Sequence, residues 1–257
     1  MSRGSPAAPV GTVLVHAAPE PLDPSFPAEA SRSLPAGTED ASSRPASTLR
    51  SSILDGIEAA SQGIQAACLG AASTLALIEI SDRHVRPYHV GDSVILVTGQ
   101  RRKVKLQTVS HSPVGFGVEA GLIDEREAMH HAERHVVSNV VGCPMMRIEV
   151  GASLRLAPRD TLLLASDGLC DNLHIHEIIE RMRCGPIGLA LRDLVTEATR
   201  RMLFPRNGRP SKPDDLTVIL YRPYTSARGR TAVRSTALSR RHVARRTVPD
   251  GHQDGSG

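Results

Sequence analysis

Two acidic turns, at Asp167 and at Asp214-Asp215, each adjoin a short apolar run of the kind that forms a β-strand. Asp167 follows the run 161–165, and Asp214 stands just before the run 216–221. A sheet that brings these strand ends together gathers hard carboxylate oxygens, which Mg²⁺ and Mn²⁺ prefer as ligands. An acid beside a strand is also a common turn residue. The pair therefore predicts a metal site, with a purely structural pair of turns as the alternative.

The composition divides the 257 residues into a folded centre and two polar ends. Residues 1–50 contain 8 of the 18 prolines and show no sustained hydrophobic period, which predicts a disordered or aberrant Pro/Ala/Ser-rich segment. Residues 224–257 contain seven Arg and two Asp, which predicts a disordered basic tail. We therefore expect one folded domain at 51–223.

The charge distribution argues against specific nucleic-acid binding. The sequence pI of about 9.1 comes from the tail, because the first 223 residues carry 24 basic and 25 acidic side chains. Three Tyr, three Phe and no Trp offer no stacking platform for bases. The four cysteines have no CxxC spacing, no apolar leader is visible, and no run reaches the ~18 apolar residues of a membrane span. These features predict a cytoplasmic protein without a membrane span.

Apolar periodicity predicts the elements that must position the two acidic turns. Helices are expected at 53–69, 124–132, 175–183 and 189–203, and strands at 73–80, 85–90, 93–98, 103–109, 147–150, 161–165 and 216–221. The first three strands are expected to form a hairpin extended into a meander. Strands in runs and helices in pairs predict an α+β layered sandwich of antiparallel sheets with helices packed outside.

The order of four motifs resembles the metal-dependent serine/threonine protein phosphatases of type 2C (PPM-type). The motifs are Ala72-Ser73-Thr74-Leu75, Val90-Gly91-Asp92-Ser93, the segment 161–172 around Ser166-Asp167-Gly168, and Asp214-Asp215-Leu216-Thr217-Val218. The resemblance covers residues 53 to 222. It implies two stacked antiparallel β-sheets flanked by helices.

The same resemblance implies hydrolysis of phosphoserine and phosphothreonine in proteins at a Mn²⁺ or Mg²⁺ centre, with a phosphorylated protein as substrate or partner. The roles that it assigns are direct metal ligands at Asp167 and Asp214, a ligand of a third, weaker ion at Asp92, a less favoured ligand at Asp215, and structural turns at Gly91 and Gly168. It assigns no catalytic side chain.

The sequence departs from the family at its first metal motif. The pattern Asp-Gly-x-Gly-Gly is not present, and Asp55-Gly56 lies inside a predicted helix. The fold is therefore expected to be incomplete at the N-terminus. Three explanations stay open: a pseudophosphatase that binds or scaffolds phosphoproteins, a catalytic protein with other N-terminal ligands, or an out-of-frame reading of residues 1–50.

Two further motifs are predicted to carry no chemistry. His131 and His135 have the i, i+4 spacing of a zinc pair, but solvated or capping histidines are the simpler interpretation. Gly115-x-Gly117 lacks the Lys of a phosphate-binding loop and predicts a mobile loop on the substrate side.

Overall fold

The computed structural model describes residues 11–17, 46–67, 70–206, 208–225, 231–232 and 235–240. Its helices are α1 (Ala46–Ala66), α2 (Pro113–Glu119), α3 (Glu125–Ala128), α4 (Asp167–Cys170), α5 (Ile175–Met182) and α6 (Ile187–Leu203). Its strands are β1 (Gly11–Ala17), β2 (Thr74–Ser81), β3 (His84–Val90), β4 (Val94–Thr98), β5 (Val104–Gln107), β6 (Glu149–Val150), β7 (Leu154–Arg155), β8 (Thr161–Ala165), β9 (Leu216–Tyr221), β10 (Tyr224–Thr225), β11 (Thr231–Ala232) and β12 (Ser235–Arg240).

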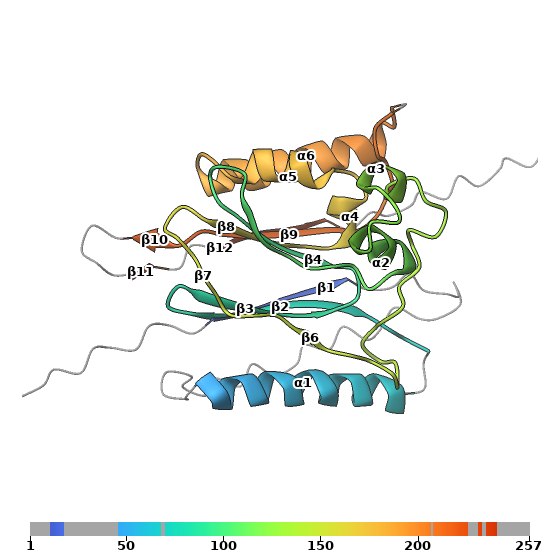
Figure 1. Ribbon diagram of the computed structural model, residues 1–257, viewed down its shortest axis with the longest axis vertical. Coiled ribbons are helices and arrows are strands. Elements are labelled where there is room, and N and C mark those ends of the chain that lie inside the picture. The colour runs from blue at the N-terminus through green and yellow to red at the C-terminus, as the bar shows by residue number, and fades with distance from the viewer. Residues whose placement is uncertain are drawn as a thin grey trace, which may run out of the picture.

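Two antiparallel sheets lie face to face, with helices on their outer faces (Figure 1). Within the described residues, one sheet has the order β1-β2-β3-β6 with β7 also paired to β3, and the other has the order β12-β9-β8-β4-β5. Helix α1 covers the outer face of the first sheet, and α5 and α6 cover that of the second (Figure 1). The predicted fold class, an α+β sandwich of two stacked antiparallel sheets, is confirmed.

Three apolar layers follow from the two-residue period of the strands. In β8, Leu162 and Leu164 pack between the sheets, while Leu163 and Ala165 pack against α5 and α6. On β2, odd-numbered residues such as Leu77 pack toward α1 and even-numbered ones pack between the sheets. These strands are buried on both faces, which explains why they read as continuous apolar runs rather than as alternating patterns.

The predicted meander of the first three strands is wrong at its third strand. β2 and β3 form the expected hairpin, but β4 pairs with β5 and β8 in the other sheet. The chain crosses between sheets at Gly91, whose φ of 105° favours glycine. A hydrophobic pattern cannot report this crossing, because both sheets bury the same types of residue.

Two helical predictions also change. The segment around Gly115-x-Gly117, expected to be a mobile loop, lies in α2, which starts with Ser112 as N-cap and Pro113 in the first turn. The helix expected at 124–132 is reduced to the single turn of α3, although its predicted cap is confirmed, since Asp124 accepts hydrogen bonds from Arg126 N and Glu127 N. The pair Asp55-Gly56 lies inside α1, as expected.

Parts of the two polar ends form strands. β1 pairs with β2, and β12 pairs with β9, both antiparallel. These strands lie inside the segments 1–50 and 224–257, for which composition predicts disorder; most of each segment, and also Cys68, lies outside the described residues. Across the described part of the chain, no helix is long and apolar enough to cross a membrane.

The turn at Gly91 generates the first prediction. A Cβ at Gly91 would lie 2.4 Å from Thr74 Cγ2, whereas a Cβ at Gly121, where φ is 70°, would meet no atom within 4 Å. Gly91→Ala should therefore combine backbone strain with overpacking and lower the free energy of unfolding by ~2–4 kcal/mol, against ~1 kcal/mol for Gly121→Ala. Urea denaturation measures the free energy of unfolding of both variants. Equal decreases would show that the contact with Thr74 does not contribute to the effect.

Candidate metal centre

The end of β8 is tied to the start of β9 by the buried side chain of Ser166. Its Oγ donates to the Asp215 carbonyl at 3.1 Å and accepts from Thr217 N at 3.0 Å. Asp167, the next residue along the chain, consequently lies beside the loop that precedes β9 and carries Asp214. The two acidic turns, 47 positions apart in the chain, are brought to one edge of the second sheet.

Gly168 allows the two turns to approach closely. A Cβ at this position would lie only 2.3 Å from the Asp215 carbonyl oxygen, so any other residue would push the α4 turn away from the loop before β9. The Gly168 amide donates to Asp167 Oδ1 at 2.9 Å, which orients that carboxylate.

The amide side chain of Asn172 joins the α4 turn to the same loop. Asn172 is fully buried. Its Nδ2 donates to the carbonyl of Gly168 at 2.9 Å and to that of Lys212 at 2.8 Å, and its Oδ1 accepts from Lys212 N at 2.9 Å. Both polar backbone atoms of Lys212 are therefore held by one side chain.

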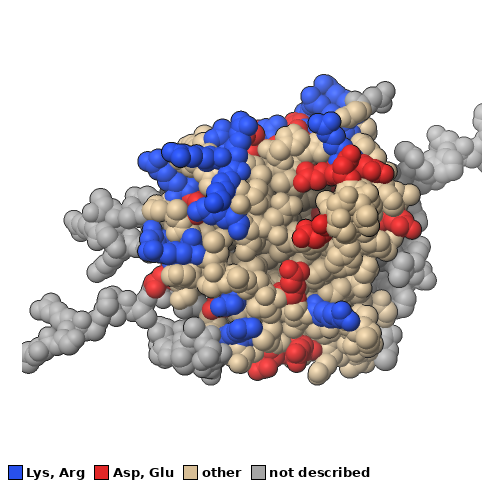
Figure 2. All heavy atoms as spheres, viewed as in Figure 1, with Lys and Arg blue, Asp and Glu red and all other residues tan. Residues whose placement is uncertain are grey.

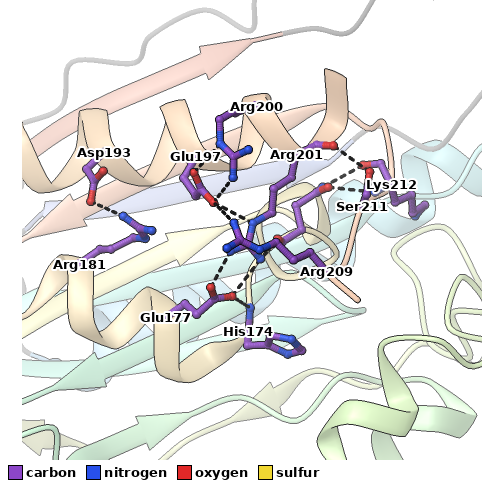
Figure 3. A network of polar contacts seen from close by, with 11 residues as sticks. His174, Glu177, Arg181, Asp193, Glu197, Arg200, Arg201, Arg209, Ser211 and Lys212 are labelled. Atoms are coloured by element: carbon purple, nitrogen blue, oxygen red, sulfur yellow. Dashed lines mark hydrogen bonds and ion pairs between the residues drawn. The ribbon is translucent and has the colours of Figure 1, made fainter. Parts of the chain in front are cut away.

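Arg201 of α6 supports this junction from behind. Its guanidinium donates to the Asn172 carbonyl at 2.9 Å and pairs with Glu177 of α5 at 2.5 Å and with Glu197 at 2.9 Å. Figure 3 shows Arg201 reaching from α6 toward Glu177, with Ser211 on the loop beside it. The Ser211 hydroxyl donates to the Arg201 carbonyl at 2.8 Å. Because only 4% of the Arg201 side chain is exposed, its charge is stabilised by these partners rather than by water.

Three carboxylates meet where the two turns adjoin. One oxygen each from Asp167, Asp171 and Asp214 lies within 4.8 Å of the others. The ammonium of Lys212 lies among them, 2.7 Å from Asp171 Oδ2, 2.9 Å from Asp214 Oδ2 and 3.6 Å from Asp167 Oδ2. The three carboxylates of Asp167, Asp171 and Asp214 are called the acid cluster below.

The pKa of Asp167 reflects both its burial and the negative charges around it. Burial, together with the carboxylates of Asp92, Asp214 and Asp171, raises this pKa to about 7 in spite of Lys212. Burial also raises the pKa of Asp92, and the carboxylate of Asp171 raises it further. A bound divalent cation would relieve this repulsion.

The donor set suits a hard divalent cation. Carboxylate oxygens are the ligands of Mg²⁺ and Mn²⁺, and the spacing of the three acids already accommodates one cation, the lysine ammonium. The residues present therefore fit a metal ion, provided that Lys212 moves away from it.

A cleft of about 550 Å³ opens beside the acid cluster. Asp92, Asp167 and Asp171 line one part of it, and α2 and α3 contribute Val114, Val118 and Ala128. Figure 2 shows acidic side chains scattered mainly over the right half of this face, and basic ones gathered at the upper left with others at the top right. A substrate in the cleft would lie against the acid cluster.

The predicted site residues differ in their placement. Asp167 and Asp214 lie together, Asp92 lines the same cleft outside the three-acid group, and Asp215 is exposed and also lies outside that group. Sequence reasoning missed Asp171, whose i, i+4 spacing from Asp167 on a helical turn was an available signal. It also missed Lys212, since nothing in the sequence shows where a lysine side chain points.

A second polar group, His89, His111 and Glu149, favours hydrogen bonding over metal ligation. His111 Nδ1 accepts from Gly91 N at 3.0 Å and from Asn139 Nδ2 at 2.8 Å. The proton of the neutral ring must then be on Nε2, which donates to Glu149 Oε2 at 2.9 Å. An Nε2 that carries a proton has no lone pair for a metal ion.

The histidine pair suggested by spacing forms no such group. Among the described residues, the clusters of three or more candidate ligands are the His89 group and the three aspartates, and neither His131 nor His135 belongs to them.

This architecture, an antiparallel α+β sandwich with carboxylates at one sheet edge, is the class of fold found in solved bacterial serine/threonine phosphatases. The chain is similar to the Streptococcus agalactiae serine/threonine phosphatase, with a TM-score of 0.56 and 26% identity over 63% of this chain and 69% of that one. It is also similar to the phosphatase Stp1 from Staphylococcus aureus, with a TM-score of 0.52 and 28% identity over 60% of this chain and 61% of that one. No protein-family model matches the chain.

A curated relative supports the same family. A Streptococcus pyogenes serotype M6 protein that carries the name of a 2C-type protein phosphatase is 34% identical over 106 residues, which are 41% of this chain and 41% of that protein. The chain thus matches well under half of the length of this relative. Together with the solved structures, it confirms the resemblance to type 2C phosphatases that the motifs indicated.

The Asn172 junction generates a prediction. Asn172→Ala leaves two carbonyls and one amide without their partner and should lower the free energy of unfolding by ~2–4 kcal/mol. Hydrogen exchange at the Lys212 amide should accelerate. Asn139→Ala is the control, because it also loses three hydrogen bonds but away from the loop. An unchanged exchange rate at Lys212 in Asn172→Ala would contradict this role of the side chain.

Glu149 generates a prediction for acid stability. The nearby His89 and the hydrogen-bonded His111 lower its pKa from 4.5 to about 2. Because the pKa of Glu149 is lower in the folded state than in the unfolded state, its carboxylate adds to the free energy of unfolding above pH 4.5. This contribution disappears as the pH falls toward 2. The gap in unfolding free energy between wild type and Glu149→Gln, measured by urea denaturation, should therefore narrow from pH 6 to pH 2.5. A gap that stays constant would contradict the assignment.

Proposed function

We propose that residues 51–223 act as a metal-dependent phosphatase domain that hydrolyses phosphoserine and phosphothreonine in proteins. The observation that carries the proposal is the convergence of Asp167 and Asp214 at one sheet edge, with oxygens close enough to share a cation. The similarity to solved serine/threonine phosphatases at 26–28% identity supports the reaction class. A cytoplasmic location stays a prediction from the sequence.

Asp167, Asp171 and Asp214 would hold the metal, and Asp92 would serve a third, weaker ion. The structure of the catalytic domain of the phosphatase PstP, which shares this fold at 21% identity, contains two manganese ions. Mn²⁺ or Mg²⁺ is accordingly the proposed cofactor. When bound, such an ion polarises phosphoryl oxygens and lowers the pKa of a coordinated water to ~7.

The chain's own residues would position the substrate for this chemistry. The cleft lined by α2 and α3 would take the residues around the phosphorylated side chain, with the phosphate directed to the acid cluster. Arg134 also lines this cleft and offers the phosphate a positive charge. The hydrogen bonds of Asn172 and Ser166 would keep the carboxylates at fixed positions during the reaction.

A second candidate function is phosphoprotein binding without turnover. It is favoured by the ammonium of Lys212 among the three carboxylates and by a sequence that lacks the Asp-Gly-x-Gly-Gly motif. Such a pseudophosphatase would use the same cleft to hold or scaffold a phosphorylated partner.

Hydrolysis of p-nitrophenyl phosphate with and without Mn²⁺ tests the enzyme. Wild type should show Mn²⁺-dependent turnover, and Asp167→Asn should lower it at least ~100-fold, since loss of a residue that only orients a metal ligand already costs about 10–100-fold. Asp193→Asn is the control, because Asp193 pairs with Arg181 on the helical layer. Phosphopeptide binding without turnover in wild type would overturn the enzyme and support the second candidate.

A further inference from the structure

We propose that Lys212 is a built-in counter-cation of the acid cluster, which a divalent metal ion must displace in order to bind. The inference rests on the metal-binding part of the proposed function and adds a regulatory property to that site. It is carried by the position of the Lys212 ammonium, within hydrogen-bonding distance of Asp171 and Asp214 and 3.6 Å from Asp167.

The ammonium occupies the position that a cation bound by these acids would take. Its three N–H donors face three carboxylates of opposite charge, and two of them, Asp171 and Asp214, lie within hydrogen-bonding distance. A divalent ion held by the same oxygens would lie within a few ångströms of Nζ, where two positive charges repel strongly in a partly desolvated site. The ammonium and the metal ion therefore exclude each other.

The backbone of Lys212 is fixed, but its side chain is free to leave. Asn172 holds the amide and the carbonyl of Lys212, and Ser211 anchors the preceding residue to Arg201. The Lys212 side chain remains 27% exposed at the edge of the cluster. Rotation about its four carbon–carbon bonds can move the ammonium into water without any change in the loop, so exchange for a metal ion needs no unfolding.

This arrangement sets the apparent affinity for metal. The apparent dissociation constant equals the intrinsic constant divided by the fraction of molecules in which the ammonium has left the cluster. If that fraction is about one tenth, Lys212 weakens metal binding ~10-fold. Without metal, the same ammonium offsets the mutual repulsion of three carboxylates and stabilises the fold.

Mn²⁺ titration followed by the electron paramagnetic resonance of free Mn²⁺ tests the proposal independently of turnover. Lys212→Met should lower the apparent dissociation constant at least ~10-fold, whereas Lys212→Arg, which retains the charge, should not. Without metal, Lys212→Met should have a lower Tm, and Mn²⁺ should raise that Tm by more than it raises the Tm of wild type. Arg209→Met is the matched control, since Arg209 lies on the same loop but faces Glu197 at 3.8 Å.

Wild-type protein gives a second readout that needs no variant to fold. Acetic anhydride labelling quantified by mass spectrometry should find Lys212 protected without metal and more reactive with saturating Mn²⁺, while the exposed Lys103 stays unchanged. Unchanged labelling of Lys212 at saturation, or unchanged or weaker Mn²⁺ binding by Lys212→Met, would overturn the proposal. Mn²⁺ affinity in Lys212→Met that survives Asp167→Asn would also overturn it.

These outcomes are separable from the phosphatase proposal. Tighter Mn²⁺ binding by Lys212→Met with no hydrolysis of p-nitrophenyl phosphate would support the counter-cation and reject the enzyme. Mn²⁺-dependent hydrolysis by wild type, with an affinity that Lys212→Met does not change, would support the enzyme and reject the counter-cation.

Discussion

The buried amide of Asn172 joins the two halves of the acid cluster. One half is the α4 turn that follows β8, and the other is the loop that precedes β9. The two halves are far apart in the chain, so local hydrogen bonds within either segment cannot hold them together. Three hydrogen bonds from one side chain do so, inside a region where each unmade bond costs free energy. The relative position of Asp167 and Asp214 depends on this contact and on the bonds of Ser166 between the strands.

Support for the junction comes from the helical layer. Arg201 is buried between α5 and α6 and is neutralised by Glu177 and Glu197, while it also donates to the Asn172 carbonyl. A buried arginine that lacked either acid would destabilise the fold, because its charge would be poorly compensated. The packing of α5 against α6 is therefore linked to the geometry of the site. The outer layer of the sandwich thus contributes to the cation site as well as to the apolar core.

The acid cluster places three mutually repelling carboxylates around a single ammonium group. Three carboxylates lie within 4.8 Å of one another, and burial, followed by repulsion from neighbouring carboxylates, raises the pKa of Asp167 to about 7 even with an ammonium nearby. Lys212 reduces the repulsion in the absence of any other cation. A site that binds metal tightly would carry no such competitor, whereas a site that must stay folded without metal benefits from one.

The sequence by itself determined most of the strands between residues 74 and 221, the long helices, the α+β class and the pair Asp167 and Asp214, because apolar period and motif order are local properties of the chain. Tertiary structure decided the rest. The chain crosses between the sheets at Gly91, which places β4 in the second sheet. The hydrophobic pattern could not show this crossing, because the strands of both sheets are equally buried. Only folding brings Asn172 and Lys212 to the acids, since side-chain direction and contacts between segments 40 positions apart are not encoded in spacing.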